Sequence, residues 1–390
     1  MQSGGLFTKF DLLSTYVKNS HKLSRPWLAE DGATIAPASG MAWELGEQFT
    51  GWLACSYAGG CAVFARLSDR QLNFLVVVNA LVIAVAVVLA GDTFLSLYNF
   101  QSMSAQVPEL ALLALGVMLA MIAGSGGIDL SGIALANLSG IVSYLLIRDW
   151  VSADDLPLTF VWLFAGIALL VGLVGGMING ALVAFVGLTP IIATLGTQLF
   201  FTGIAVLITN GSAVSLGYIE PLDDFGNTPV LGVPMCFALF IAIAVILGVV
   251  LRYTPFGLKL YLMGSNAKAA RYAGIPNRRM LFVIYTICGV LASIAGIIIA
   301  ARTSSVKWDY GTSYVLIAIL IVVMAGVRPE GGYGRIICVV LSATALQMLS
   351  SLFNFIDISN FFRDCAWGLL LLIFLATSRF DVRSFLPLRS

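Results

Sequence analysis

The 390-residue sequence has little charge: Asp, Glu, Lys and Arg make up only 11% of it, whereas 59% is hydrophobic. Soluble domains carry about 25% charged residues, so a chain of this composition cannot cover its surface in water. We therefore expect lipid to be much of its solvent, and we predict an integral membrane protein. The formal net charge of +1 gives no electrostatic basis for a nucleic-acid partner.

Residues that carry catalysis, metal binding and ATP hydrolysis are scarce as well. His21 is the one histidine, which nearly excludes His-based metal sites and His general bases. The six cysteines include no C-x-x-C pair, and we interpret them as small apolar residues rather than ligands or a disulfide framework. No G-x-x-x-x-G-K-[ST] phosphate loop is present. These absences predict no catalytic residue, metal site or cofactor in this chain, so it is not expected to be an enzyme.

Long apolar segments are what the sequence has instead. A membrane-spanning helix needs about 20 mostly apolar residues, and ten segments reach or approach that length. They are residues 72–90, 107–123, 133–147, 159–186, 190–209, 230–251, 280–301, 314–327, 336–355 and 362–377. The sequence thus predicts an all-α, polytopic transmembrane helical bundle of about ten spans within residues 72–380. Residues 1–71 are interpreted as an N-terminal cytoplasmic extension with an interfacial stretch, and residues 381–390 as a cytoplasmic tail.

Lysine and arginine are distributed unevenly among the predicted loops. Residues 252–279 form the longest loop between spans that is rich in Lys and Arg, whereas Glu220, Asp223 and Asp224 gather in a loop on the other side. Cytoplasmic loops carry the excess of positive residues. We therefore expect loop 252–279 and both termini to be cytoplasmic, which requires an even number of spans.

One face of the predicted span 190–209 combines hydroxyl, amide and aromatic groups. Thr194, Thr197, Gln198 and Phe201 lie at positions i, i+3, i+4 and i+7 and therefore share this face. Such a face suits the passage of a polyhydroxylated solute, so these residues are candidates for a solute path. Ordinary hydrogen bonding between helices is the alternative.

The predicted span 159–186 carries a stripe of small residues. Gly172, Gly176 and Gly180 are spaced four apart, a pattern that lets two helix backbones approach closely. Asn179 lies beside this stripe. Its amide is a further candidate for the solute path, with a hydrogen bond to a neighbouring helix as the alternative.

Asp129 lies in the glycine-rich segment GGIDLS, between two apolar segments. An ionisable group at membrane depth is costly and needs a partner or water. One interpretation is structural: the carboxylate caps the helix that begins near Ser131 by accepting hydrogen bonds from free backbone N–H groups. The other is a direct role in transport or gating. Asp129 is nearly alone as an acid at this depth, which disfavours an ion-coupled mechanism.

Loop 252–279 is too polar to cross the membrane. Its segment SNAKAARYA favours a short helix, ended by a glycine and a proline. One interpretation is a plain cytoplasmic loop that follows the positive-inside rule. The other is a docking helix for a cytosolic partner, whose coupling residues would be Gly264, Asn266, Ala269, Ala270 and Gly274.

Four segments together carry a resemblance to a known family. FGLKLYLMGSNAKAARYAGI resembles the cytoplasmic coupling segment of bacterial permeases in the ribose/xylose/autoinducer-2 group of ABC importers, the branched sugar permease family. GGIDLS resembles the G-G-I-D-L-S-V-G signature of that group, and TPIIATLGTQLFFTGIAVLITNG is similar to its P-F-I-A-T-L-G segment. GVRPEGGYGRI resembles its late glycine-rich turn, although Arg328, Pro329 and Glu330 stand where family members usually have small residues. The resemblance covers roughly residues 72–380.

The resemblance implies a permease subunit of an ABC importer in the bacterial inner membrane, which translocates a small sugar-like solute. Its implied partners are a cytosolic ATP-binding subunit that holds the ATP, a periplasmic solute-binding protein, and a second permease copy or sister permease. The identity of the solute stays open between ribose, xylose, another sugar and autoinducer-2. The alternative function is a stand-alone secondary transporter or channel, which would require coupling acids or filter-like carbonyl segments at depth.

Overall fold

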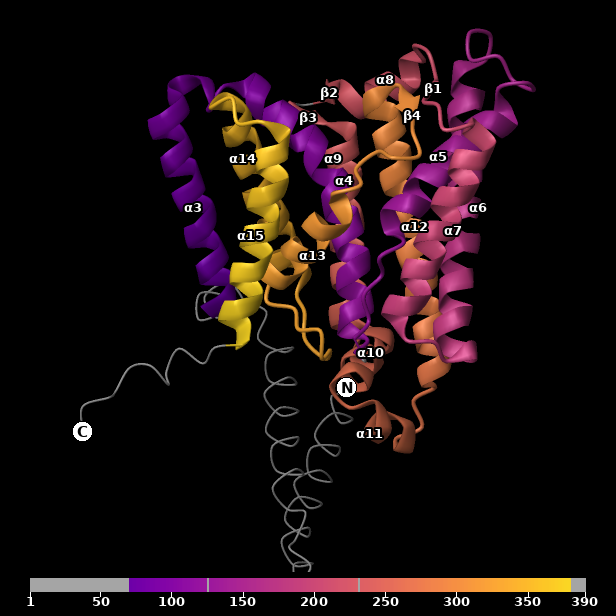
Figure 1. Cartoon of the computed structure of the whole chain (residues 1–390), viewed down its shortest axis with the longest axis vertical. Coiled ribbons are helices and arrows are strands. Elements are labelled where there is room, and N and C mark those ends of the chain that lie inside the picture. Colours follow the sequence, from indigo (N-terminus) through magenta and orange to yellow (C-terminus); the bar gives the residue numbers. More distant parts are fainter. Residues whose placement is uncertain (1–69, 125, 231, 380–390) are drawn as a thin grey trace, which may run out of the picture. The chain divides into compact units, whose positions relative to one another are not determined.

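The computed structural model describes residues 70–379, apart from residues 125 and 231 (Figure 1). The predicted N-terminal extension, except for its last two residues, and the predicted tail lie outside the described residues. The helices are α3 (Arg70–Ala90), η2 (Gly91–Thr93), α4 (Leu97–Ile122), α5 (Gly132–Ile147), α6 (Pro157–Ala181), η3 (Leu182–Val186), α7 (Pro190–Thr209), α8 (Glu220–Asn227), α9 (Met235–Tyr253), α10 (Pro255–Ser265), α11 (Ala267–Tyr272), α12 (Asn277–Thr303), α13 (Tyr314–Met324), α14 (Ile336–Phe355) and α15 (Asn360–Arg379). The strands are β1 (Val214–Ser215), β2 (Pro229–Val230), β3 (Val233–Pro234) and β4 (Ser305–Val306).

The predicted all-α membrane bundle is confirmed. Each of the ten predicted spans contains a helix. Within the described part of the chain, seven helices are long and apolar enough to cross a membrane: α3, α4, α6 with η3, α7, α9, α12 and α14. The helices α5 and α13 are apolar but shorter, with 16 and 11 residues, so the estimate of about ten spans includes helices that cross only part of a bilayer.

The helices run side by side, and the connecting elements gather at two ends (Figure 1). We call one end the α11 end, because α10 and α11 lie there. Gln71, at the start of α3, donates a hydrogen bond to the carbonyl of Met324 at 2.8 Å, which ties the start of α3 to the C-terminus of α13. We call the other end the α8 end; there β1 pairs antiparallel with β4, and β2 with β3.

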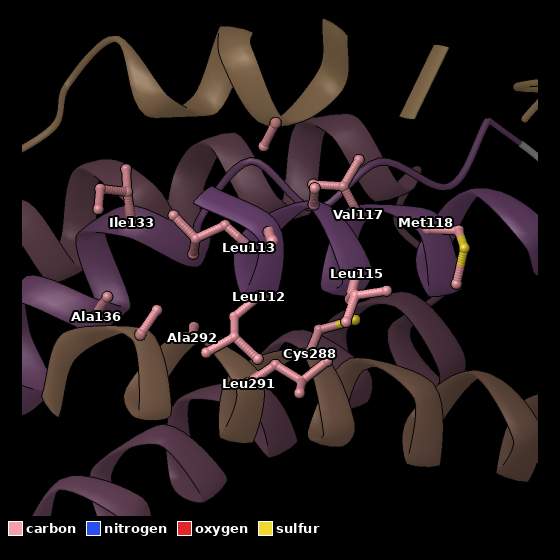
Figure 2. Packing of buried hydrophobic residues seen from close by; sticks show 14 of the residues in the cluster. Leu112, Leu113, Leu115, Val117, Met118, Ile133, Ala136, Cys288, Leu291 and Ala292 are labelled. Carbon is pink, nitrogen blue, oxygen red and sulfur yellow. The ribbon is translucent and has the colours of Figure 1, made fainter. Parts of the chain in front are cut away.

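The helix α4 lies at the centre of the packing. Leu112 and Leu115 of α4 lie close to Cys288 and Leu291 of α12 (Figure 2), and all four side chains are buried. Lipid tails are as apolar as these side chains, so close van der Waals packing, rather than removal from water, holds helices together inside a bilayer.

The glycine stripe of α6 packs directly on α12, as its spacing predicted. A Cβ atom added to Gly172 would lie 2.6 Å from the carbonyl oxygen of Gly289, and one added to Gly176 would lie 2.6 Å from that of Tyr285. Real Cβ atoms do not approach so closely. The absence of side chains therefore allows the two backbones to touch, which fixes Asn179, also on α6, close to the bundle interior.

Candidate functional site

A helix break separates α4 from α5. The chain leaves α4 at Ile122, and α5 begins only at Gly132, part-way along the bundle (Figure 1). Within this break Asp129 is 5% exposed and Ser131 is fully buried. Irregular backbone at membrane depth is tolerated only where protein surrounds it or water reaches it. We therefore expect the residues around this break to satisfy its backbone hydrogen bonds.

Asp129 forms a local turn at the start of α5. Its Oδ1 accepts hydrogen bonds from the backbone N–H of Ser131 at 3.0 Å and from the Ser131 hydroxyl at 2.7 Å. The carboxylate thus meets a free N–H at the N-terminus of α5, where the helix dipole favours negative charge. A cavity of about 20 Å³ adjoins Asp129 and lies between Leu113 and Cys288; this is room for about one water molecule.

A chain of buried hydrogen bonds links this turn to α6 and α7. Asn179 Nδ2 donates to Ser131 Oγ at 2.7 Å, and Thr197 Oγ1 donates to Asn179 Oδ1 at 2.6 Å. Thr194 Oγ1 lies 3.1 Å from the carbonyl oxygen of Ile128, within hydrogen-bond distance. Two candidates for the solute path, Asn179 and Thr194, therefore contact polar groups of the helix break directly, and Thr197 holds Asn179 in place.

The two remaining candidates on α7 differ in their exposure. Phe201 is 2% exposed and packs in the main core, whereas Gln198 is half-buried. Gln198 is thus the more exposed of these two side chains. A solute path along α7 stays a prediction.

Three glycine-rich segments that are far apart in sequence meet at the α11 end. A Cβ atom on Gly264, in the last turn of α10, would lie 1.9 Å from the carbonyl oxygen of Ile122 and 2.5 Å from the backbone nitrogen of Gly332. A Cβ atom on Gly331 would lie 2.4 Å from Cα of Gly124. We call Gly124, Gly264, Gly331 and Gly332 the glycine junction. It brings α10, the start of the helix break and the turn after α13 into direct backbone contact.

Tyr261 adds a side-chain contact to the glycine junction. Its hydroxyl donates a hydrogen bond to the carbonyl oxygen of Gly334 at 2.8 Å. Burial raises the pKa of Tyr261 to about 12, so the hydroxyl keeps its proton, and remains a donor, at neutral pH. Tyr261 thus fastens α10 to the turn that follows α13.

Two of the predicted coupling residues shape the ends of α11. Asn266 is its N-cap, and the side-chain oxygen accepts from the backbone N–H groups of Lys268 and Ala269 at 3.1 and 3.0 Å. Gly274 follows the helix with φ of +80°, a left-handed conformation that glycine adopts without a steric penalty. The predicted short helix is confirmed, whereas α10, which precedes it, was not predicted.

The predicted contact surface of α11 needs a correction. Ala270 is only 4% exposed and belongs to the core, so it cannot offer its side chain to a partner. Gly264 is likewise buried in the glycine junction. Ala269 is exposed, and Tyr272, which was not among the predicted coupling residues, is 93% exposed. Exposed tyrosines often carry a large share of the binding free energy in protein interfaces.

The expectation that Asp129 is nearly alone as a buried acid is wrong. Glu109 of α4 is 1% exposed and forms an ion pair with Arg302 near the end of α12. The hydroxyls of Tyr310 and Tyr314 lie 3.4 and 3.3 Å from Glu109 Oε2. The signal was visible, since Glu109 interrupts a predicted span, but its partner lies 193 residues away.

Comparison with known proteins gives the family. Residues 99–375, more than half of the chain, match the family described as branched-chain amino acid transport system, permease component. The chain belongs to this permease family. The permease is 32% identical to the ribose import permease protein RbsC of Escherichia coli K12, over 75% of this chain and 90% of that protein. It is 33% identical to RbsC of Bacillus subtilis, over 75% and 88% of the two chains.

A second group of relatives includes the autoinducer 2 import system permease protein LsrD of Photorhabdus luminescens. The permease is 33% identical to it, over 65% of this chain and 76% of that protein. No solved structure matches the permease. The predicted resemblance to import permeases is thus confirmed, and the chain is a membrane transport component rather than an enzyme.

The alternative of a stand-alone secondary transporter or channel gains no support. The relatives named above are permeases of import systems. Glu109 and Asp129 are the buried acids of the described residues, and each has a partner in the structure, Arg302 and Ser131.

Proposed function

We propose that this permease imports a small, neutral, sugar-like solute and that ATP hydrolysis on a separate cytosolic subunit drives the transport. The observation that carries this proposal is the glycine junction. It joins α10, beside the exposed helix α11, to the start of the helix break. Packed elements move as units rather than deforming, so a displacement of α10 would be passed to the break that Asp129 and Asn179 hold.

The solute class rests on the relatives and on the composition of the buried polar groups. Two relatives are named for the import of ribose and one for the import of autoinducer 2. In the described part of the chain, the buried charged side chains are Glu109 and Asp129, both of which have partners. A solute with a full charge would find little to balance it, which favours a neutral one.

The orientation in the membrane is inferred from the charges at the two ends of the bundle. Exposed Arg271, Arg278 and Arg279 lie at the α11 end, and exposed Glu220 and Asp224 lie on α8. The positive-inside rule then makes the α11 end cytoplasmic. In this proposal the chain resides in the bacterial inner membrane with both termini inside. A periplasmic solute-binding protein delivers solute at the α8 end, and a second permease copy or a sister permease completes the path.

The docking of the ATP-binding subunit can be tested on the exposed face of α11. Removing an exposed aromatic by Tyr272→Ala, or placing a charge in the contact by Ala269→Glu, should weaken the complex. Interface changes of this kind cost about 2–5 kcal/mol, so co-purification with the ATP-binding subunit should fall at least tenfold.

Tyr218→Ala is the matched control, because Tyr218 is also exposed, at 72%, but precedes α8 at the opposite end. It should leave the complex intact. If both α11 variants bound the ATP-binding subunit and imported solute normally, the exposed face of α11 would not be its docking surface and the proposal would fail.

A further inference from the structure

Two neighbouring polar cavities lie between α4 and α14 toward the α8 end. The first has a volume of about 210 Å³, and the second, which also reaches α13 and α15, has about 330 Å³. Gln106 of α4 and Gln347 of α14 line both cavities, and Gln347 Nε2 donates a hydrogen bond to Gln106 Oε1 at 3.0 Å. This amide pair is the shared wall between the two spaces.

We propose that these cavities form a binding site for a neutral, polyhydroxylated solute of pentose size, with Gln106 and Gln347 as its central polar contacts. The inference rests on the proposed import function and gives it a location. The site lies at the end of the bundle where the proposed binding protein delivers solute, and it is distinct from the face of α7.

The first cavity carries uncharged groups that suit hydroxyls. Asn99, Ser102, Ser351 and Asn354 line it together with the amide pair. Amide and hydroxyl side chains offer both donors and acceptors, as each sugar hydroxyl does. A carboxylate or ammonium solute would meet no opposite charge in this first cavity, which favours a neutral polyol there.

The second cavity adds apolar surface. Tyr314 and Trp367 line it beside Arg363 and Asp364, whose opposite charges leave the wall neutral. Aromatic side chains combine a large apolar face with a polar tip, which suits the C–H face and hydroxyl edge of a sugar ring.

The buried ion pair positions one of these aromatic residues. The Tyr314 hydroxyl lies 3.3 Å from Glu109, whose charge is balanced by Arg302. Neither charged residue lines the cavity. Glu109 and Arg302 are therefore positioning residues for Tyr314 in this proposal.

A purely structural contact between α4 and α14 would not explain the two open cavities beside it. A polar pair that only joined two helices would be expected to close the space around it, because unfilled space forfeits van der Waals contacts. Here the second cavity alone reaches the lower end of the size range of ligand pockets, about 300–1,000 Å³. The polar lining also continues beyond the amide pair into both cavities.

The test measures whether solute protects a cysteine placed in the site. Cys365 adjoins the site and is exposed, so it is first replaced by serine, as are Cys55 and Cys61. Ser350→Cys then places a thiol in the second cavity, and Ser305→Cys on β4 is a half-buried control outside both cavities. The full-length chain is labelled with a maleimide in opened membranes, with millimolar D-ribose, D-xylose or L-leucine present.

We expect D-ribose or D-xylose to slow labelling at position 350 but not at position 305, and L-leucine to have no effect. The variant Gln106→Leu/Gln347→Leu replaces both partners of the hydrogen bond, which limits the loss of stability. It should need about tenfold more sugar for the same protection, the equivalent of about one strong polar contact. Gln101→Leu, on the same helix but outside both cavities, should behave like the parent.

Two results would overturn the site. The first is that neither pentose slows labelling at position 350. The second is that the double variant is protected at the same sugar concentrations as the parent while its thermal stability is unchanged. Protection by L-leucine alone would place an amino acid in the site and refute the neutral-polyol class. Because the assay needs no ATP, its outcome is independent of the ATP-driven uptake in the proposed function, which a transport assay tests separately.

Discussion

At the scale of single residues, the sequence shows which polar groups lie at membrane depth but not which partners they bind. Asp129 stands out in an apolar region, and its contact with the N-terminus of α5 was predicted from local spacing. Its further links could not be, because Ser131 and Asn179 are 48 residues apart and Asn179 and Thr197 come from different helices. No periodicity within one helix encodes which neighbouring helix it packs against.

Asn179 allows the structural and the solute-contacting interpretations to be separated. Asn179→Leu removes both a donor and an acceptor and leaves the buried hydroxyls of Ser131 and Thr197 without this partner. Each lost bond costs about 0.6–2 kcal/mol inside a bilayer, so the thermal midpoint in detergent should fall by several degrees. Gln198→Leu, at a half-buried position, should leave the midpoint unchanged.

Uptake measurements complete this comparison. If α7 lines a solute path, Gln198→Leu lowers uptake at normal membrane abundance; unchanged kinetics would assign this face to packing. Asn179→Leu with a normal thermal midpoint and no uptake would instead show that Asn179 acts in transport, through solute contact or through the helix break, and not in stability.

At the scale of elements, the sequence predicted α11 but missed α10 and the glycine junction. The segment of α10 is short and lies in a loop rich in Lys and Arg, so it was interpreted as part of that loop. Its apolar residues Phe256, Leu260 and Met263 nevertheless lie at helical spacing and pack on the core. The junction joins segments around positions 124, 264 and 331, each of which was noticed as a separate motif. Only the fold shows that the same contact requires glycine in all three segments, because three backbones meet there.

The glycine junction predicts an uncoupled permease. Gly264→Ala places a Cβ atom 1.9 Å from the carbonyl oxygen of Ile122, which forces α10 away from the end of α4. We expect uptake to fall at least tenfold while the ATP-binding subunit still co-purifies, because the exposed face of α11 is unchanged.

Gly248→Ala is the control for that variant. Gly248 also lies within a helix, α9, but a Cβ atom there meets no atom within 4 Å. Alanine favours a helix over glycine by about 1 kcal/mol, so this control should be as stable as the parent or more so and should transport normally. Normal uptake by Gly264→Ala would show that backbone contact at the junction is not needed for coupling.

At the scale of the whole molecule, hydropathy and charge distribution predict different properties: the helical bundle, which is confirmed, and its sidedness, which stays a prediction. Counting apolar runs treats α5 and α13 as spans, although with 16 and 11 residues they are too short to cross a bilayer core of about 30 Å. The Lys and Arg bias depends only on which loops share a side. Miscounting a pair of spans leaves every other loop on the same side of the membrane. The predicted sidedness can therefore be tested independently of the number of spans.

Labelling from outside intact cells tests that sidedness directly. Asp224 on α8 and Lys268 on α11 are both exposed and lie at opposite ends of the bundle (Figure 1). In a background where Cys55, Cys61 and Cys365 are serine, an impermeant maleimide should modify Asp224→Cys and spare Lys268→Cys. Both should react once the membrane is opened, which controls for accessibility. The reverse pattern would place α11 outside, where no cytosolic ATP-binding subunit can reach it, and would refute the docking proposal together with the topology.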